Sequence, residues 1–150
     1  MDKEKLLRLI QNQHVIPRIR CMLEERDLRK TEYDFDANQL CFLRRISRRE
    51  GMSQAELANE VMVPPPTVTR KLNRLIQDGI VERRDDSTDY RKKCLYLTEA
   101  GEKAAQFVNT MNAAHMSILF DGFTEDEQNQ YADFLQRIRN NIENNLKEHP

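Results

Sequence analysis

The sequence predicts a mainly α-helical protein with one small β-hairpin. Apolar residues recur at three- and four-residue spacing through most of the 150 residues, which is the pattern of a helix with one buried face. The chain has four glycines, and Gly51, Gly79 and Gly122 each stand where an apolar stripe ends. Two alternating stretches, residues 80–84 and 93–97, flank a polar segment, and this pattern indicates a hairpin with a long loop.

The first predicted helix runs from residue 2 to about residue 30, and Pro17 should kink it or restart it. The second begins after Asp36, a candidate N-cap with Gln39 three residues later. Both helices carry an apolar side that must pack against another element.

Two further helices are predicted in the middle of the chain. Ser53 and Glu56 form a capping box, so a short helix begins there. The prolines at 64–66 cannot continue that helix, but proline is tolerated in the first turn of a new one. The next helix therefore covers about Pro65–Gln77, and its apolar stripe consists of Val68, Leu72, Leu75 and Ile76.

Two long helices follow the hairpin. Thr98 caps a helix that runs to about Phe120, and Thr124 with Glu127 forms a capping box at the start of the last helix. The last helix carries an almost heptad-spaced apolar stripe, which indicates packing against another helix. Its members are Tyr131, Phe134, Leu135, Ile138, Ile142 and Leu146.

Charge is unevenly distributed, although the net charge is −1. Residues 44–93 hold 12 basic and 8 acidic side chains, an excess of +4, whereas residues 94–150 hold 4 basic and 9 acidic, an excess of −5. Such runs often belong to solvated surfaces. A basic middle section is also what a nucleic-acid-binding segment requires.

Several classes of protein are excluded by what the sequence lacks. The N-terminus has no signal-peptide core, and no stretch reaches the roughly 20 apolar residues of a membrane-spanning helix. No glycine-rich phosphate loop, nucleophile elbow or metal-binding spacing of Cys and His is present. We therefore expect a cytoplasmic protein that is not an enzyme, holds no metal or cofactor, and has no membrane partner.

Residues 53–98 carry the strongest functional signal. A short helix, a tight turn, a second helix and a hairpin are the arrangement of a winged helix-turn-helix, whose second helix enters the DNA major groove. At about 100° per residue, Thr67, Arg70 and Arg74 lie opposite the apolar stripe of that second helix. Arginine can contact guanine with two hydrogen bonds, and a threonine methyl group can contact thymine. A solvated helix face without a ligand is the alternative interpretation.

The predicted hairpin tip is also basic. Arg83 and Arg84 precede it, and residues 89–93 (DYRKK) end it. A cationic loop on a thin hairpin can enter a narrow minor groove, where the negative potential attracts arginine. Asp89 stands two residues before Arg91 and could hold that arginine in an extended conformation. A solvated loop is again the alternative.

In this order and spacing, the segments resemble the core of the MarR (multiple-antibiotic-resistance regulator) family of bacterial transcription factors. The segments that carry the resemblance are 53–58 (SQAELA), 67–70 (TVTR), 75–83 (LIQDGIVER), 89–91 (DYR) and 95–101 (LYLTEAG). The prolines at 64 and 66 depart from the family pattern, because proline supplies neither the N–H nor the hydroxyl that the family usually has there.

The resemblance implies a winged helix-turn-helix domain over residues 36–98 and a helical homodimerisation region over residues 1–35 and 99–150. It implies a repressor that binds a pseudo-palindromic operator in double-stranded DNA and is released by a small-molecule effector. By the same resemblance, the DNA-binding residues are Ser53 and Gln54 at phosphates, Thr67, Thr69, Arg70 and Arg74 in the major groove, and Arg91 with Asp89 in the minor groove.

Two other functions remain open from the sequence. A winged-helix module can contact a protein instead of DNA. The three cysteines, Cys21, Cys41 and Cys94, also allow a regulator that senses oxidants, although Cys21 lies further along the first helix than the sensing cysteine of that branch of the family.

Overall fold

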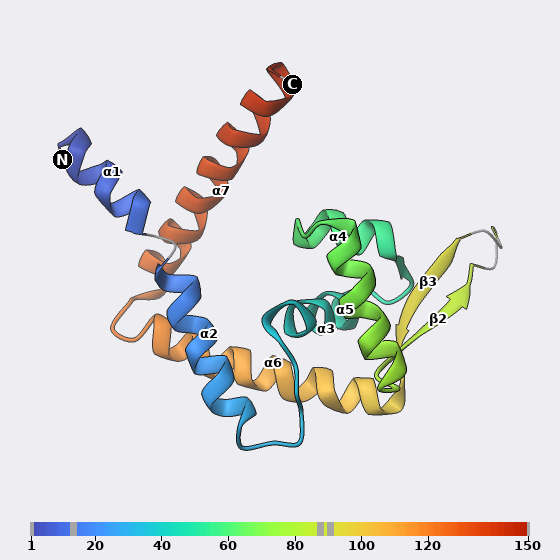
Figure 1. Cartoon of the computed structure of the whole chain (residues 1–150). Helices are drawn as coiled ribbons and strands as arrows, with labels where there is room; N and C mark the ends of the chain where they lie inside the picture. Colours follow the sequence, from blue (N-terminus) through green and yellow to red (C-terminus); the bar gives the residue numbers. More distant parts are fainter. Residues whose placement is uncertain (1, 13–14, 87–88, 90–91, 150) are drawn as a thin grey trace. The chain divides into compact units, whose positions relative to one another are not determined.

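The computed structural model describes residues 2–12, 15–86, 89 and 92–149 (Figure 1). Its contacts divide the chain into two compact units, Met1–His115 and Met116–Pro150. In chain order the elements are α1 (Lys3–Asn12), α2 (Val15–Leu28), α3 (Ala37–Arg48), β1 (Met52–Ser53), α4 (Gln54–Val61), α5 (Pro65–Gln77), β2 (Val81–Asp85), β3 (Lys93–Leu97), α6 (Glu99–Leu119) and α7 (Glu125–Glu148). The predicted fold class, mainly helical with a small β-hairpin wing, is confirmed.

Within the described residues, the sheet has three antiparallel strands in the order β1-β3-β2. The predicted hairpin is formed by β2 and β3, in a register that runs from Val81 opposite Leu97 to Asp85 opposite Lys93. Strand β1 was not predicted, because two residues are too short to show an alternating pattern. It pairs Met52 with Leu95, and thereby adds a third strand on the side of β3 away from β2.

The predicted capping boxes at Asp36, Ser53 and Thr124 are all present. At α4 the Ser53 hydroxyl accepts a hydrogen bond from the Glu56 amide at 3.2 Å, and the Glu56 carboxylate accepts one from the Ser53 amide at 2.7 Å. Both hydrogen bonds lower the pKa of the Glu56 carboxyl group, and the bond with the Ser53 backbone has the larger effect. The start of α4 is thus fixed by side chains that are local in sequence.

The first predicted helix is described as two segments, and residues 13 and 14 between them lie outside the described residues. Helix α1 ends at Asn12 and α2 begins at Val15. Pro17 lies within α2, and the predicted kink or restart of the helix at this proline stays a prediction.

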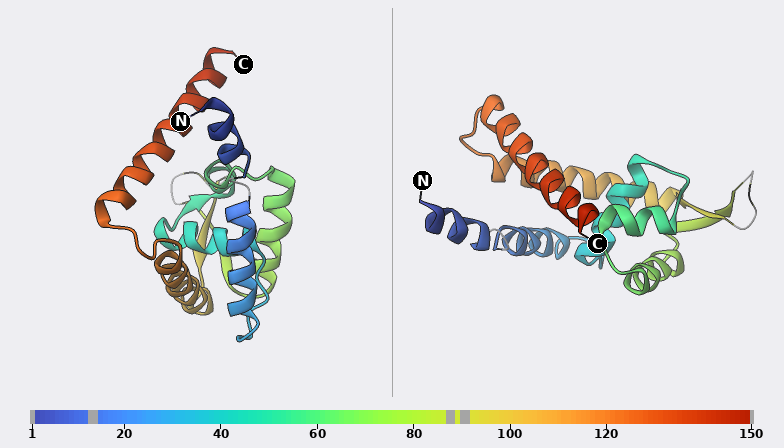
Figure 2. Two further views of the ribbon diagram at one scale, coloured as in Figure 1. Left: turned by 90° about the vertical axis from the view of Figure 1, so that its left-hand side faces the viewer. Right: turned by 90° about the horizontal axis from the view of Figure 1, so that it is seen from above.

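The hydrophobic core of the first unit lies between α3, α4, α5, the sheet and the first half of α6. Its fully buried side chains include Phe42, Leu43, Ile46, Leu57, Val68, Leu72, Leu75, Leu95 and Val108. The predicted apolar stripe of α5 faces this core, and its polar face is therefore outside. The β2–β3 hairpin extends away from these helices (Figure 2).

The beginning of α6 is joined to the turn between α5 and β2. The Thr98 hydroxyl donates to the Gly79 carbonyl at 2.6 Å and accepts from the Gly101 amide at 3.0 Å. The Thr98 amide donates to the Ile80 carbonyl at 3.1 Å. Gly101 lies so close to this turn that a Cβ atom on it would be 1.9 Å from the Ile80 oxygen.

A buried histidine connects α2 to α6. The Nε2 atom of His115 lies 2.8 Å from Oδ2 of Asp27, and the His115 side chain is just 2% exposed. Hydrogen bonds from Arg26 first, and from His115 second, hold the pKa of Asp27 well below its ordinary value. No local pattern in the sequence predicts this pair, because the two residues are 88 positions apart.

This lowered pKa predicts an acid-dependent loss of stability. An aspartate whose pKa is lower in the folded chain stabilises the fold above its unfolded pKa of about 4, and this contribution is lost as the pH falls through the folded pKa. At about pH 5, the urea midpoint of unfolding should therefore be higher for wild type than for Asp27→Asn. This difference in midpoint should shrink steadily as the pH falls toward about 3.

The control is Glu25→Gln, because Glu25 is an exposed carboxylate on the same helix whose partner Arg29 is 4.0 Å away. Exposed pairs of this kind contribute little to stability, so its urea midpoint should stay close to that of wild type. A difference between wild type and Asp27→Asn that is constant with pH would refute the role of the Asp27 charge.

In the second unit, helix α7 exposes its whole predicted apolar stripe. Phe134 is 53% exposed, Ile138 47% and Ile142 56%. Near the start of the helix, the Phe120 ring packs edge-on against Phe123 and Tyr131. None of the helices in the described part of the chain is both long enough and apolar enough to span a membrane.

Candidate nucleic-acid interface

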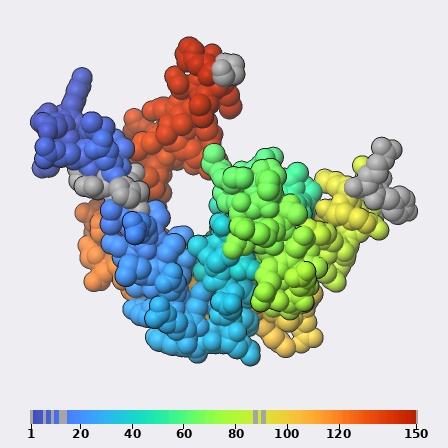
Figure 3. All heavy atoms as spheres, viewed as in Figure 1, coloured from blue at the N-terminus to red at the C-terminus, as the bar shows by residue number. Residues whose placement is uncertain are grey.

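Helices α4 and α5 form a helix-turn-helix, and β2 and β3 form the wing beside it (Figure 1). Met62 ends α4 in the left-handed conformation, with φ of 53°, and thereby turns the chain sharply toward α5. In the space-filling view, the surfaces of α4 and α5 adjoin that of the wing strands (Figure 3). One face of the first unit thus carries α4, α5 and the described part of the wing strands.

The first turn of α5 has no free backbone donor. Its N-cap, Pro64, makes no side-chain capping bond, and the next two residues are prolines without N–H groups. The amides of Thr67 and Val68 both donate to the Pro64 carbonyl, at 2.9 and 3.1 Å. This helix start therefore cannot bind a phosphate through its amides, as many helix N-termini do, and side chains must make the contacts.

The predicted DNA-binding residues of α5 differ in whether their side chains already have hydrogen-bond or ion-pair partners. Arg70 is exposed, and among the described residues it has no hydrogen-bond or ion-pair partner. The Nε atom of Arg74 donates to Asp78 at 2.8 Å, and this bond raises the pKa of the Arg74 guanidinium. The Thr69 hydroxyl donates to the Pro65 carbonyl at 3.0 Å, so its methyl group is the part left for a ligand.

A network of side chains connects α4, α5 and the wing. One guanidinium nitrogen of Arg83 donates to Oε1 of Gln54 and to Oδ1 of Asn73, each at 2.9 Å. The Gln54 amide nitrogen donates to the Thr69 hydroxyl at 2.7 Å. The predicted residues Gln54 and Thr69 are thereby in direct contact. Arg83 and Asn73 were not among the predicted site residues, because their contacts span 29 and 10 positions.

The remaining cations of the wing strands are paired within the wing. Arg84 stacks on the Tyr96 ring, with its central carbon 4.3 Å from the ring centroid, and its Nε donates to Glu82 at 2.7 Å. Lys93 forms an ion pair with Asp85. These pairs are exposed, so each can exchange its partner for a phosphate at small cost.

The predicted pair at the wing tip is only partly within the described residues. Arg91 lies outside them. The Asp89 amide donates to the Asp86 carboxylate at 3.2 Å, and the Asp89 carbonyl accepts from the Lys92 amide at 2.8 Å. The pairing of Asp89 with Arg91 stays a prediction.

The three cysteines are free thiols, of which Cys94 is buried. Its Sγ atom donates to Asp86 at 3.6 Å, and burial, together with that carboxylate, raises the pKa of the Cys94 thiol. A raised pKa disfavours the reactive thiolate. Among the described residues, no three potential metal ligands come together.

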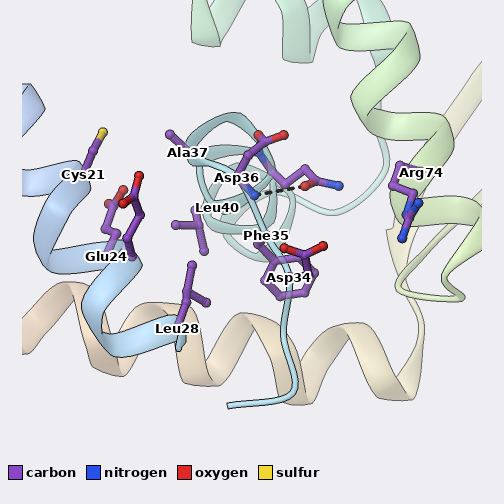
Figure 4. A pocket seen from close by; sticks show the side chains of 11 residues that line it. Cys21, Glu24, Leu28, Asp34, Phe35, Asp36, Ala37, Leu40 and Arg74 are labelled. Carbon is purple, nitrogen blue, oxygen red and sulfur yellow. Dashed lines mark hydrogen bonds between the residues drawn. The ribbon is translucent and has the colours of Figure 1, made fainter. Parts of the chain in front are cut away.

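A cavity of about 420 Å³ lies between α2, the segment before α3, and α5. Glu24 and Leu28 of α2 line one side with Leu40 of α3, Asp34 lies in the segment before α3, and Arg74 of α5 lies on the far side (Figure 4). Arg74, on the second helix of the helix-turn-helix, thus lines the cavity.

A helix-turn-helix with a polar, partly cationic outer face and an adjacent wing defines a winged helix-turn-helix protein. Residues 35–93 match the model of the MarR family. The HTH-type transcriptional regulator BilQ of Clostridium symbiosum (strain WAL-14163) is 31% identical to this chain over 99 residues, which are 66% of this chain and 69% of BilQ. The chain belongs to the MarR family, and it is therefore a transcriptional regulator of that family.

Two other proteins illustrate the similarity. An uncharacterised HTH-type transcriptional regulator, YybA of Bacillus subtilis (strain 168), is 28% identical over 112 residues, which are 75% of each chain. A putative MarR-family transcriptional regulator from Listeria monocytogenes, solved in complex with 26mer DNA, has a TM-score of 0.82 at 22% identity, over 93% of this chain and 94% of that one. The second likeness supports the same winged fold.

Proposed function

We propose that this MarR-family regulator is a cytoplasmic homodimer that represses transcription by binding a pseudo-palindromic operator in double-stranded DNA. The observation that carries the proposal is Arg70, an exposed arginine on the outer face of α5 with no partner among the described residues. An unpaired guanidinium on the helix that enters the major groove is poised for guanine or phosphate.

The other proposed contacts are distributed over three elements. Thr67, Thr69 and Arg74 of α5 face the major groove, Ser53 and Gln54 at the start of α4 face phosphates, and Arg91 with Asp89 enters the minor groove. The Ser53 and Gln54 side chains are already held by hydrogen bonds, which lowers the entropic cost of contacting DNA. Two such domains in a dimer would read two half-sites about one helical turn apart.

A salt titration tests the proposal. DNA fragments selected from a random pool are bound to the full chain, and fluorescence anisotropy gives the affinity at increasing salt. Each phosphate contact should contribute about −0.9 to the slope of log affinity against log salt. Arg70→Ala should weaken binding by about 5- to 150-fold, equivalent to about 1–3 kcal/mol, without lowering the melting temperature.

The matched control is Lys103→Ala, which removes an exposed cation of α6 that pairs with Glu99. Its affinity for DNA should equal that of wild type. An affinity that does not change with salt would refute DNA binding and would favour a winged-helix module that contacts protein.

The exposed apolar stripe of α7 supports the homodimer. Six large apolar side chains lie on one exposed face of this helix, from Tyr131 to Leu146. A contiguous apolar face of this length on a helix usually marks a protein interface. Helices α1 and α2 also expose apolar side chains, among them Ile10, Ile16 and Ile19.

The cavity beside α5 supports release by a small-molecule effector. A volume of about 420 Å³ is within the usual size of a small-molecule site, and Arg74 belongs to both the cavity lining and the proposed DNA contacts. An effector that binds better when α5 is displaced would shift the dimer away from the DNA-binding arrangement. A thermal-shift screen over phenolic, lipid and oxidant compounds tests for such a ligand.

A further inference from the structure

The network around Arg83 fixes the direction in which two side-chain amides point. Strand alternation places Arg83 on the same sheet face as Val81, which is buried, and from there its guanidinium reaches both helices. Arginine has donors and no acceptor. The amide oxygens of Gln54 and Asn73, each 2.9 Å from the guanidinium, must therefore face Arg83.

The rest of the network agrees with this orientation. With its oxygen on Arg83, Gln54 turns its nitrogen toward the Thr69 hydroxyl at 2.7 Å. That hydroxyl accepts the bond and gives its own hydrogen to the Pro65 carbonyl at 3.0 Å. In each of these four bonds a donor faces an acceptor, so reversing either amide would place a donor against a donor.

The amide nitrogen of Asn73 and the other N–H groups of Arg83 are donors that have no hydrogen-bond partner among the described residues. The guanidinium of Arg70, on the same helix as Asn73, has none either. An asparagine that reads adenine must accept from the adenine amino group while it donates to N7. Arg83 occupies one of the two lone pairs of the Asn73 oxygen and turns that oxygen toward itself, so Asn73 is poorly oriented to make both bonds to adenine.

We propose that Arg83 is a positioning residue: by holding the Asn73 oxygen, it leaves the Asn73 amide nitrogen as the group that the α4–α5 surface presents to a base edge at this position. This surface would select base-edge acceptors, above all O6 and N7 of guanine, over the amino groups of adenine and cytosine. The inference rests on the proposed DNA binding, and it adds the class of base that the operator presents to Asn73.

Operator selection from random double-stranded DNA tests the inference, with wild type and the variants Arg83→Met and Arg83→Lys of the full chain. Arg83→Met frees the Asn73 oxygen. At one or two positions of each half-site, the preference for guanine over adenine should then fall by fivefold or more. Arg83→Lys keeps the charge but loses the planar fork, so it should lower the same preference while the salt slope stays that of wild type.

Two controls separate positioning from a simple phosphate contact. Arg84→Met removes the neighbouring cation, whose hydrogen bonds go to Glu82, and should leave the base preferences unchanged. In an Asn73→Ala background, Arg83→Met should no longer alter the base preference at the Asn73 position.

The outcomes are distinct. Weaker binding by Arg83→Met with an unchanged base profile would overturn the inference and leave DNA binding intact. A wild-type chain that selects no sequence would overturn the proposed function itself. Thermal melting of each variant establishes whether it is folded. If Arg83→Met does not fold, the base preference of Arg83→Lys tests the inference instead.

Discussion

Replacing Gly101 by alanine is expected to destabilise the winged domain by about 3 kcal/mol or more. Alanine is the better helix former by about 1 kcal/mol, so helix propensity alone predicts the opposite sign. The added Cβ would lie 1.9 Å from the Ile80 carbonyl oxygen and 3.3 Å from the Leu97 Cβ. Because the closest atom belongs to the backbone, α6 as a whole must move away from the α5–β2 turn.

Thermal unfolding followed by circular dichroism measures this effect. For a chain of this size, 3 kcal/mol lowers the melting temperature by roughly 6–12 °C. Glu102→Ala is the control, because Glu102 is the exposed next residue of the same helix, and its effect should stay within about 0.5 kcal/mol. Equal melting temperatures for Gly101→Ala and wild type would mean that α6 is not packed against this turn.

Replacing Ile138 by aspartate should convert the proposed dimer to a monomer. Ile138 lies in the middle of the exposed apolar stripe of α7 and is 47% exposed in the single chain. A carboxylate in an apolar interface would be desolvated without a partner, at a cost of about 3 kcal/mol or more. Dimer affinity should therefore fall at least 100-fold, and DNA affinity should fall with it because the two half-sites are no longer bound together.

Sedimentation velocity at micromolar concentration measures this change. Asn140→Asp introduces the same carboxylate about 200° around the helix from Ile138, and this control should remain dimeric. A dimer that persists in Ile138→Asp would show that the α7 stripe is not the contact between subunits.

Local signals in the sequence were sufficient for most of the secondary structure. The capping boxes of Ser53 and Thr124 lie within four consecutive residues, and both helices begin where these residues predict. The apolar stripe of α5 likewise predicted which face is buried, because burial follows the helical period. Features that depend on such short-range patterns were recovered, including the wing hairpin.

Features that depend on distant residues were not predicted. Strand β1 exists because Met52 meets Leu95, and Asp27 meets His115 across 88 positions. For the site, periodicity placed Arg70 and Arg74 on the outer face of α5, but it could not show that Arg74 pairs with Asp78 while Arg70 has no partner among the described residues. The contacts of Arg83 with Gln54 and Asn73 depend on how the wing packs beside α5, which no local pattern encodes.

The contacts of Thr98 and Gly101 with the turn at Ile80 couple the orientation of α5 to that of α6. Because the turn that follows α5 is hydrogen-bonded to Thr98, just before α6, and Gly101 lies against the same turn, a rotation of α6 should carry the end of α5 with it. Helix α6 has 21 residues and is thus about 30 Å long. In the proposed dimer, a tilt of α6 by about 6° about its last residues would displace its first turn, and with it the end of α5, by about 3 Å.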